Sequence, residues 1–200
     1  MSDALTVLRE LNRPVRTAEA ARLGIKPAAL YALAARGEVE RYARGVFVLA
    51  DRTILARPDL TIVGLRSPRA VVCLTTALWF HDLGTQPPRT ISVAVRRGDH
   101  RPNAAWPPLR VHSFSPRSYA SGIETHVFDG VEVKVYSREK TLADCFKFRH
   151  QVGMDVVLEA LHDYAAGPRD MDELARQVRI CRVDNVMRPY LETALWTAGG

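Results

Sequence analysis

Apolar residues near the start of the chain recur with the spacing of short helices. Leucines at every third position predict a first helix over residues 4–11. A second helix over residues 18–23 follows Thr17, a residue type favoured at the N-cap. A third helix begins at Pro27, where the missing N–H costs nothing, and ends at Gly37. The first 37 residues therefore predict three closely spaced helices.

The second and third of these helices have the spacing of a helix-turn-helix. This motif needs a short helix, a tight turn and a second helix that enters the major groove of DNA. Gly24 supplies the turn, and Ile25 is expected in the core beneath it. Leu30, Leu33 and Ala34 have the i, i+3, i+4 spacing of the buried face of the third helix. The opposite face of this helix is therefore expected to meet DNA.

Two short strands, over residues 39–44 and 46–49, follow around Gly45 and predict a hairpin that acts as a wing. Arg41 and Arg44 lie beside its tip, where they would contact phosphates or enter the minor groove. The pattern therefore predicts a winged helix-turn-helix.

The predicted recognition helix is rich in alanine, so few of its side chains can read base edges. Tyr31 and Lys26 are expected to supply most of the direct readout, and the shape of the DNA the rest. The alternative for Tyr31 is that its ring packs on the wing. The predicted DNA-binding residues are Thr17, Arg22, Lys26, Ala28, Ala29, Tyr31, Arg36, Arg41 and Arg44.

A polar segment over residues 51–57 ends at Pro58 and predicts a domain boundary, with a DNA-binding domain at 1–57 and a second domain at 58–200. Asp129-Gly130, between two alternating strands, is the strongest hairpin signal in the chain. The fold class is therefore predicted as α+β, with a small antiparallel sheet and a helical C-terminus. The strands are expected at 91–95, 109–112, 123–128 and 131–136, and the helices at 58–66, 75–83, 138–149, 154–164, 171–178 and 184–196.

The charge of the chain favours a polyanionic partner. The formal net charge is +6, and 24 of the 28 basic residues are arginine, whose planar guanidinium suits phosphates and guanine edges. A GC-rich genome would enrich arginine and alanine in the same way, so composition leaves both explanations open. Hydrophobic residues make up 47% of the chain, which is an ordinary globular content.

Metal, disulfide and membrane chemistry are not expected. Cys73, Cys145 and Cys181 are far apart among apolar neighbours and are predicted to be reduced core residues. No cysteine or histidine spacing suits a metal, no phosphate-binding loop or other cofactor motif is present, and no run of about 18 apolar residues could span a bilayer. The N-terminus lacks the apolar stretch of a signal peptide, so a cytoplasmic protein is expected.

Three segments resemble one known family. TAEAARLGIKPAALYALAARGEVERYARGVFVL is similar to the winged domain of the AbiEi-type antitoxins of type IV toxin–antitoxin systems. PRAVVCLTTALWFHDL and SREKTLADCFKFRHQVGMDVVLEAL are similar to two later stretches of the same family, and REKTLADCFKFR is the most distinctive part. The resemblance extends from about Leu5 to Leu191.

This resemblance implies a transcriptional repressor that is also an antitoxin and not an enzyme. The winged domain would bind repeats in double-stranded DNA upstream of its own operon, with self-association on the DNA as an open possibility. The C-terminal domain would counter a nucleotidyltransferase-like toxin, and family members differ in whether they contact the toxin directly. The alternative from the residues is a winged protein-interaction module without affinity for DNA.

Two features of the second domain suggest an anion-binding or antitoxin surface. One is an arginine-rich middle segment, and the other is a charged helix in which Lys140 and Asp144 are interpreted as a surface i, i+4 ion pair. The basic residues of this candidate surface are Arg89, Arg96, Arg97, Arg138, Lys140, Lys147 and Arg149. A third hypothesis is a metal-dependent nuclease that uses Glu132 and Lys134 on one strand, although a second acidic ligand is missing and an exposed strand gives this alternation by default.

Overall fold

The computed structural model describes residues 3–52, 55–102 and 106–198, which form two compact units. The described part of the first unit comprises residues 3–52, 55–69, 106–108 and 125–133. The second unit comprises residues 70–102, 109–124 and 134–198. The predicted boundary before Pro58 stays a prediction, and Thr53 and Ile54 of the predicted linker lie outside the described residues.

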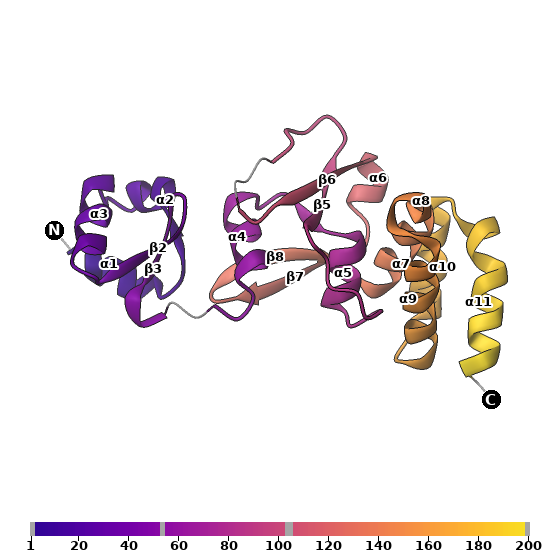
Figure 1. Ribbon diagram of the computed structural model, residues 1–200. Coiled ribbons are helices and arrows are strands. Elements are labelled where there is room, and N and C mark those ends of the chain that lie inside the picture. Colours follow the sequence, from indigo (N-terminus) through magenta and orange to yellow (C-terminus); the bar gives the residue numbers. More distant parts are fainter. Residues whose placement is uncertain (1–2, 53–54, 103–105, 199–200) are drawn as a thin grey trace. The chain divides into compact units, whose positions relative to one another are not determined.

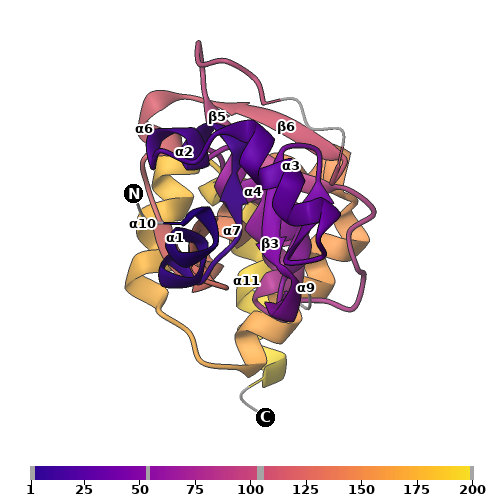
Figure 2. The same cartoon turned by 90° about the vertical axis from the view of Figure 1, so that its left-hand side faces the viewer.

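The N-terminal segment begins with three helices that agree with the sequence pattern. They are α1 (Ala4–Leu11), α2 (Thr17–Arg22) and α3 (Pro27–Ala35). A three-stranded antiparallel sheet accompanies them, with β1 (Val15–Arg16), β2 (Val39–Ala43) and β3 (Val46–Leu49) in the order β1-β3-β2. Figure 1 shows the helices gathered around the hairpin of β2 and β3, and Figure 2 shows the same segment from a second side.

One apolar cluster holds this segment together. It joins α1, the turn after α2, α3 and the strands, and each member is at most 8% exposed. The predicted core positions Ile25, Leu30 and Leu33 belong to it and are confirmed. The full set is Leu8, Val15, Ala20, Ile25, Leu30, Leu33, Val39, Phe47 and Leu49.

A short 3-10 helix (Ala50–Arg52) follows β3, and α4 (Pro58–Arg66) begins after the predicted linker. Gly64 of α4 lies so close to β8 (Val131–Tyr136) that a Cβ atom there would stand 2.5 Å from the carbonyl oxygen of Glu132. A hydrogen is thus the only side chain that this packing distance allows.

The second sheet has five strands in the order β6-β5-β4-β8-β7. Its strands are β4 (Val71–Val72), β5 (Ile91–Arg96), β6 (Leu109–Phe114), β7 (Ile123–Phe128) and β8. Asp129 and Gly130 both have positive φ, as the predicted two-residue turn between β7 and β8 requires. The sheet also contains two parallel pairs, β5 with β6 and β4 with β8, which the sequence analysis did not predict.

Helices make up the rest of the second unit, so the α+β prediction is confirmed. They are α5 (Leu74–Phe80), α6 (Pro116–Tyr119), α7 (Arg138–Lys147), α8 (Arg149–Val152), α9 (Met154–Ala166), α10 (Met171–Cys181) and α11 (Asp184–Ala198). Helix α11 continues through Pro189. Figure 1 shows α7, α9, α10 and α11 as a packed group, with α11 at its outer side.

The three cysteines lie in the core of this unit with free thiols, as predicted. Among the helices that the structure describes, none has both the length and the apolar character needed to cross a bilayer.

The close approach of α4 and β8 gives a stability prediction. Gly64→Ala should lower the free energy of unfolding by about 1–3 kcal/mol, because the new methyl group meets backbone that cannot rotate away. Chemical denaturation measures this change. Gly167→Ala is the matched control, since a Cβ there would meet its neighbours only at 3.4 Å. Equal stability of the two variants would contradict the packing described for Gly64.

Candidate functional site

The turn between α2 and α3 is built by backbone hydrogen bonds around Gly24. The N–H of Ile25 donates to the carbonyl of Ala20 (2.9 Å) and that of Gly24 to Ala21 (3.1 Å). This pair of bonds is the Schellman motif, which places its C′ residue in the left-handed region, and Gly24 has φ +83°. The turn is therefore fixed, and α3 starts at a defined position relative to α2.

Helix α3 presents a small, mostly uncharged exposed face. Lys26 precedes its first turn and is exposed, as is Ala28, whereas Ala29 is half-buried. The Tyr31 side chain is 49% exposed, and its ring meets that of Phe47 on β3 edge-on, with centroids 5.5 Å apart. Tyr31 thus packs on the hairpin and still offers its other side to a ligand.

The β2–β3 hairpin carries two exposed arginines. Arg41 lies on β2 beside a bulge, and Arg44 lies in the turn next to Gly45, which has φ +72°. Among the described residues, neither arginine forms an ion pair, and the same holds for Lys26 and for the exposed Arg22. These four cations are free to meet an anionic ligand.

Two of the predicted interface residues have partners within the segment. The guanidinium of Arg36 is paired with the carboxylate of Glu38 at 2.5 Å, so its charge is already opposed. Thr17 was interpreted as the N-cap of α2, but the N-cap is Arg16 and Thr17 is the first helical residue. The reason is that the backbone N–H of Thr17 donates to the carbonyl of Gly45 (3.0 Å), which ties the start of α2 to the hairpin.

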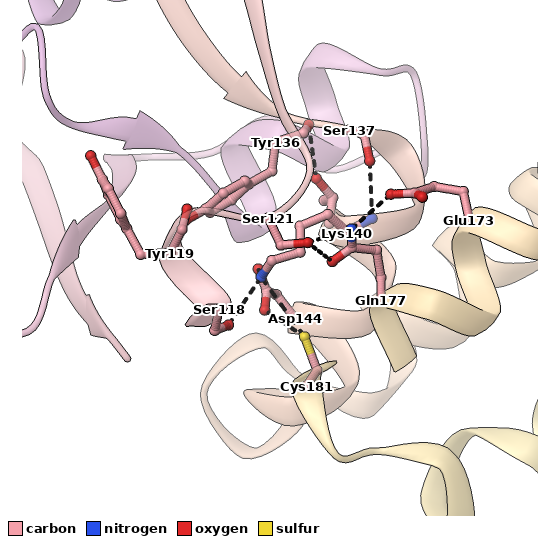
Figure 3. A network of polar contacts seen from close by, with 11 residues as sticks. Ser118, Tyr119, Ser121, Tyr136, Ser137, Lys140, Asp144, Glu173, Gln177 and Cys181 are labelled. Carbon is pink, nitrogen blue, oxygen red and sulfur yellow. Dashed lines mark hydrogen bonds and ion pairs between the residues drawn. The ribbon is translucent and has the colours of Figure 1, made fainter. Parts of the chain in front are cut away.

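The interpretation of Lys140 and Asp144 as a surface ion pair is wrong. Both side chains are 0% exposed, and Figure 3 shows them enclosed in the second unit. The ammonium of Lys140 contacts the Asp144 carboxylate directly and also donates to Ser118 Oγ (3.3 Å). The thiol of Cys181 donates to the second carboxylate oxygen (3.2 Å). Lys140 therefore cannot be part of an accessible basic surface.

Aromatic rings and a tight turn complete the surroundings of Lys140. Its Nζ lies at cation–π distances from two rings, 4.5 Å from the ring centroid of Tyr136 and 4.9 Å from that of Phe114. A Cβ on Gly122 would lie 2.6 Å from Cβ of Lys140, so only glycine fits there. Ser137 caps α7 by accepting a hydrogen bond from the backbone N–H of Lys140 (3.2 Å).

A second hydrogen-bonded chain beside this pair links a loop to α10. Ser121 Oγ and the amide of Gln177 are joined at 2.7 Å, and the same amide donates to the Glu173 carboxylate at 2.7 Å. Figure 3 shows this chain next to Lys140. Each buried polar group of the cluster thus has a partner, as a stable core requires.

The ionisation of the cluster follows from its burial. Loss of solvent raises the pKa of the Asp144 carboxyl, and the adjacent Lys140 opposes that rise. Burial, with Asp144 nearby, raises the pKa of the Cys181 thiol to about 12. Because the thiol is protonated and the ammonium inaccessible, the arrangement is suited to fixing α7 against α10 and not to nucleophilic chemistry.

The other basic candidates of the second domain do not share one environment. Arg89, Arg96, Arg97 and Lys147 are exposed. Arg138 is half-buried over the ring of Tyr164 (5.6 Å), and Arg149 is half-buried with Nη1 donating to the Phe146 carbonyl (3.0 Å).

Glu132 and Lys134 lie two residues apart on β8, where Glu132 is exposed and Lys134 is half-buried. In the described parts of the chain, no group of three or more histidine, cysteine or acidic side chains is arranged to hold a metal ion.

Residues 3–50, which contain α1 to β3, match a family model of transcriptional regulators. That family is the AbiEi antitoxin, so the resemblance is confirmed over this part of the chain. The later segments that suggested the same family lie outside the match. No curated protein matches the chain.

The chain also has a fold similar to that of solved structures. The RV2827C protein from Mycobacterium tuberculosis aligns with a TM-score of 0.59 at 12% sequence identity, over 98% of this chain and 76% of that protein. At this identity the similarity concerns the fold alone.

The buried ion pair gives a second prediction. Asp144→Ala should destabilise the protein by about 3–5 kcal/mol, because the Lys140 ammonium stays buried without its counter-charge. Denaturant unfolding of Asp144→Ala, Lys140→Met and the double variant measures the coupling. The double variant should be more stable than Asp144→Ala alone, since no unpaired charge remains. Lys147→Met, an exposed position on the same helix, should change stability by less than about 0.5 kcal/mol. Additive effects at positions 140 and 144 would contradict the pairing.

Burial of the thiols gives a third prediction. At pH 8 the thiols should be protonated and inaccessible, because burial raises the pKa of all three cysteines. Ellman's reagent should therefore detect no rapidly reacting thiol in the native protein and all three in guanidinium chloride. A thiol that reacts within seconds in the native protein would show that this core is open.

Proposed function

We propose that this protein is a DNA-binding transcriptional repressor that acts in the cytoplasm as the antitoxin of a type IV toxin–antitoxin system. The observation that carries the proposal is the family match of residues 3–50. Within those residues, a helix, a tight turn and a second helix precede a hairpin with unpaired arginines. This arrangement is the one that a winged helix-turn-helix uses on double-stranded DNA.

In this proposal α3 enters the major groove. Lys26 and Tyr31 meet base edges and the adjacent backbone, and the small Ala28 and Ala29 let the helix approach closely. Arg41 and Arg44 of the hairpin bind phosphates, as do Arg22 and Thr17 of α2. Since α3 has few side chains that can read bases, sequence-dependent DNA shape supplies part of the specificity.

Repression of its own operon would follow from binding to repeats upstream of the reading frame. Repeated operator sites are read by two or more copies of a protein, so self-association on the DNA is part of the proposal. The resemblance to the antitoxin family supports the second activity, which is to counter a nucleotidyltransferase-like toxin. The second unit is the part assigned to this activity.

Gel-shift binding to the DNA immediately upstream of the reading frame tests the repressor function. The wild type should bind this DNA in preference to scrambled competitor, more weakly at 200 mM than at 50 mM salt. Arg41→Ala/Arg44→Ala should bind about 10- to 100-fold more weakly at low salt. The slope of log affinity against log salt should fall by about 2, because two phosphate contacts are lost.

The control is Arg176→Ala/Arg179→Ala, which removes the same charge from exposed positions on α10 and should bind like the wild type. No preference of the wild type over scrambled DNA, at either salt concentration, would refute autoregulation and favour a protein-interaction module.

A further inference from the structure

The first unit has a basic pocket that extends from the predicted interface residues Thr17 and Arg44 to Arg16 and Arg66. A pocket of about 190 Å³ opens between the start of α2, the tip of the β2–β3 hairpin and the end of α4. Arg16, Arg44 and Arg66 line it together with Thr17, and none of the described residues that line it is acidic. Three arginines thus line one space, and no carboxylate is among the described residues that line it.

Two of the three arginines, Arg16 and Arg66, are held in place by backbone carbonyls and still keep free donors. Arg16 Nη1 donates to the carbonyl of Leu65 (3.3 Å), and Arg66 Nη1 donates to the carbonyl of Arg44 (3.4 Å). Each of these contacts uses one of the five N–H groups of a guanidinium. The remaining donors are available to a ligand in the pocket, and the side chains of Arg16 and Arg66 are already held before it arrives, whereas that of Arg44 is exposed.

The pocket suits one tetrahedral anion. Its volume is several times the roughly 30 Å³ that a water molecule occupies in the liquid, which leaves space for a phosphate group. The planar forks of the arginines are the donor type that binds phosphate oxygens, whereas the Thr17 hydroxyl donates to the carbonyl of Gly45 (3.4 Å).

We infer that this pocket, called here the three-arginine pocket, holds a backbone phosphate of the bound DNA, so that Arg66 of α4 extends the DNA-binding surface beyond the matched residues 3–50. This inference rests on the proposed function. It assigns a role in DNA binding to Arg16 and Arg66, neither of which the sequence analysis selected. Phosphate contacts carry no sequence information, so the pocket strengthens binding to any DNA and fixes the register of the protein.

The test compares Arg16→Gln/Arg66→Gln with wild type in binding to the upstream DNA and to scrambled DNA, at 50 and 200 mM salt. Glutamine keeps an amide donor for the backbone carbonyls, and thermal melting checks that the fold is unchanged. The variant should bind both DNAs about tenfold more weakly at 50 mM salt, and the slope of log affinity against log salt should fall by about 1. Arg176→Gln/Arg179→Gln, with the same net charge, should bind like the wild type.

Arg66→Gln alone is the second variant if the double variant melts early, and it should show about threefold weaker binding to both DNAs. Specific wild-type binding that neither variant weakens would overturn the inference and leave the proposed function intact. A loss confined to the upstream DNA would also overturn it, because a phosphate contact must affect both sequences. If the wild type does not select the upstream DNA, the proposed function itself fails and the inference with it.

Competition with inorganic phosphate distinguishes a site for DNA phosphates from a site for the free anion. At matched ionic strength, millimolar inorganic phosphate should compete weakly with DNA for the wild type and less for Arg16→Gln/Arg66→Gln. Tight binding of inorganic phosphate in the pocket, with DNA binding unchanged by the variant, would identify a site for the free anion and overturn the inference.

Discussion

The second unit depends on the burial of one ion pair. An ammonium and a carboxylate removed from water lose several kcal/mol of hydration each, and only a close, fully hydrogen-bonded arrangement offsets that loss. Lys140 and Asp144 meet this condition through partners from three places in the chain: Ser118 before β7, the ring of Tyr136 on β8 and Cys181 at the end of α10. These elements must therefore come together before the pair is fully hydrogen-bonded. The ion pair thus links α7 to the end of α10 within this unit.

The structure of the N-terminal segment is held together in a different way. Its core is purely apolar, and its geometry comes from backbone caps and small residues. The same Schellman motif that ends α2 ends α3, where Gly37 and Glu38 donate to the carbonyls of Ala34 and Leu33. These caps determine where α3 starts and where the hairpin leaves it. A rigid scaffold of this kind holds exposed side chains in position at little entropic cost on binding.

Local signals in the sequence predicted much of this architecture. The leucine spacing of α1, the glycine after α2 and the Asp129-Gly130 turn each depend on residues within a few positions, so the pattern alone was sufficient. The parallel strand pairs were not predicted. The strands β4 and β8 are far apart in the sequence, and the residue pattern along the consecutive strands β5 and β6 does not specify their relative direction. Lys140 and Asp144 were placed on the surface because an i, i+4 pair has the same spacing on an exposed helix as in a core. This face of α7 is buried only because distant elements pack against it, among them the end of α10 with Cys181 and β6 with Phe114.

The candidate DNA interface was likewise predicted only in part, because local sequence patterns do not show which distant residues become neighbours. Sequence patterns identified the exposed face of α3 and the hairpin arginines, since both follow from helix periodicity and turn chemistry. Arg16 and Arg66 are 50 residues apart and become neighbours only because α4 packs beside β1, so no local pattern could pair them. Their position also bears on specificity. In the proposed complex, a recognition helix with Tyr31 and Lys26 as its main polar contacts has little capacity to distinguish bases directly, and each added phosphate contact raises affinity for every sequence equally. Under this proposal, discrimination comes from the fit of the phosphate-binding groups to one DNA shape and from the spacing of repeated sites. The proposed role of the arginine cluster at the hairpin tip is to contribute to both, by holding the protein in one register along the groove.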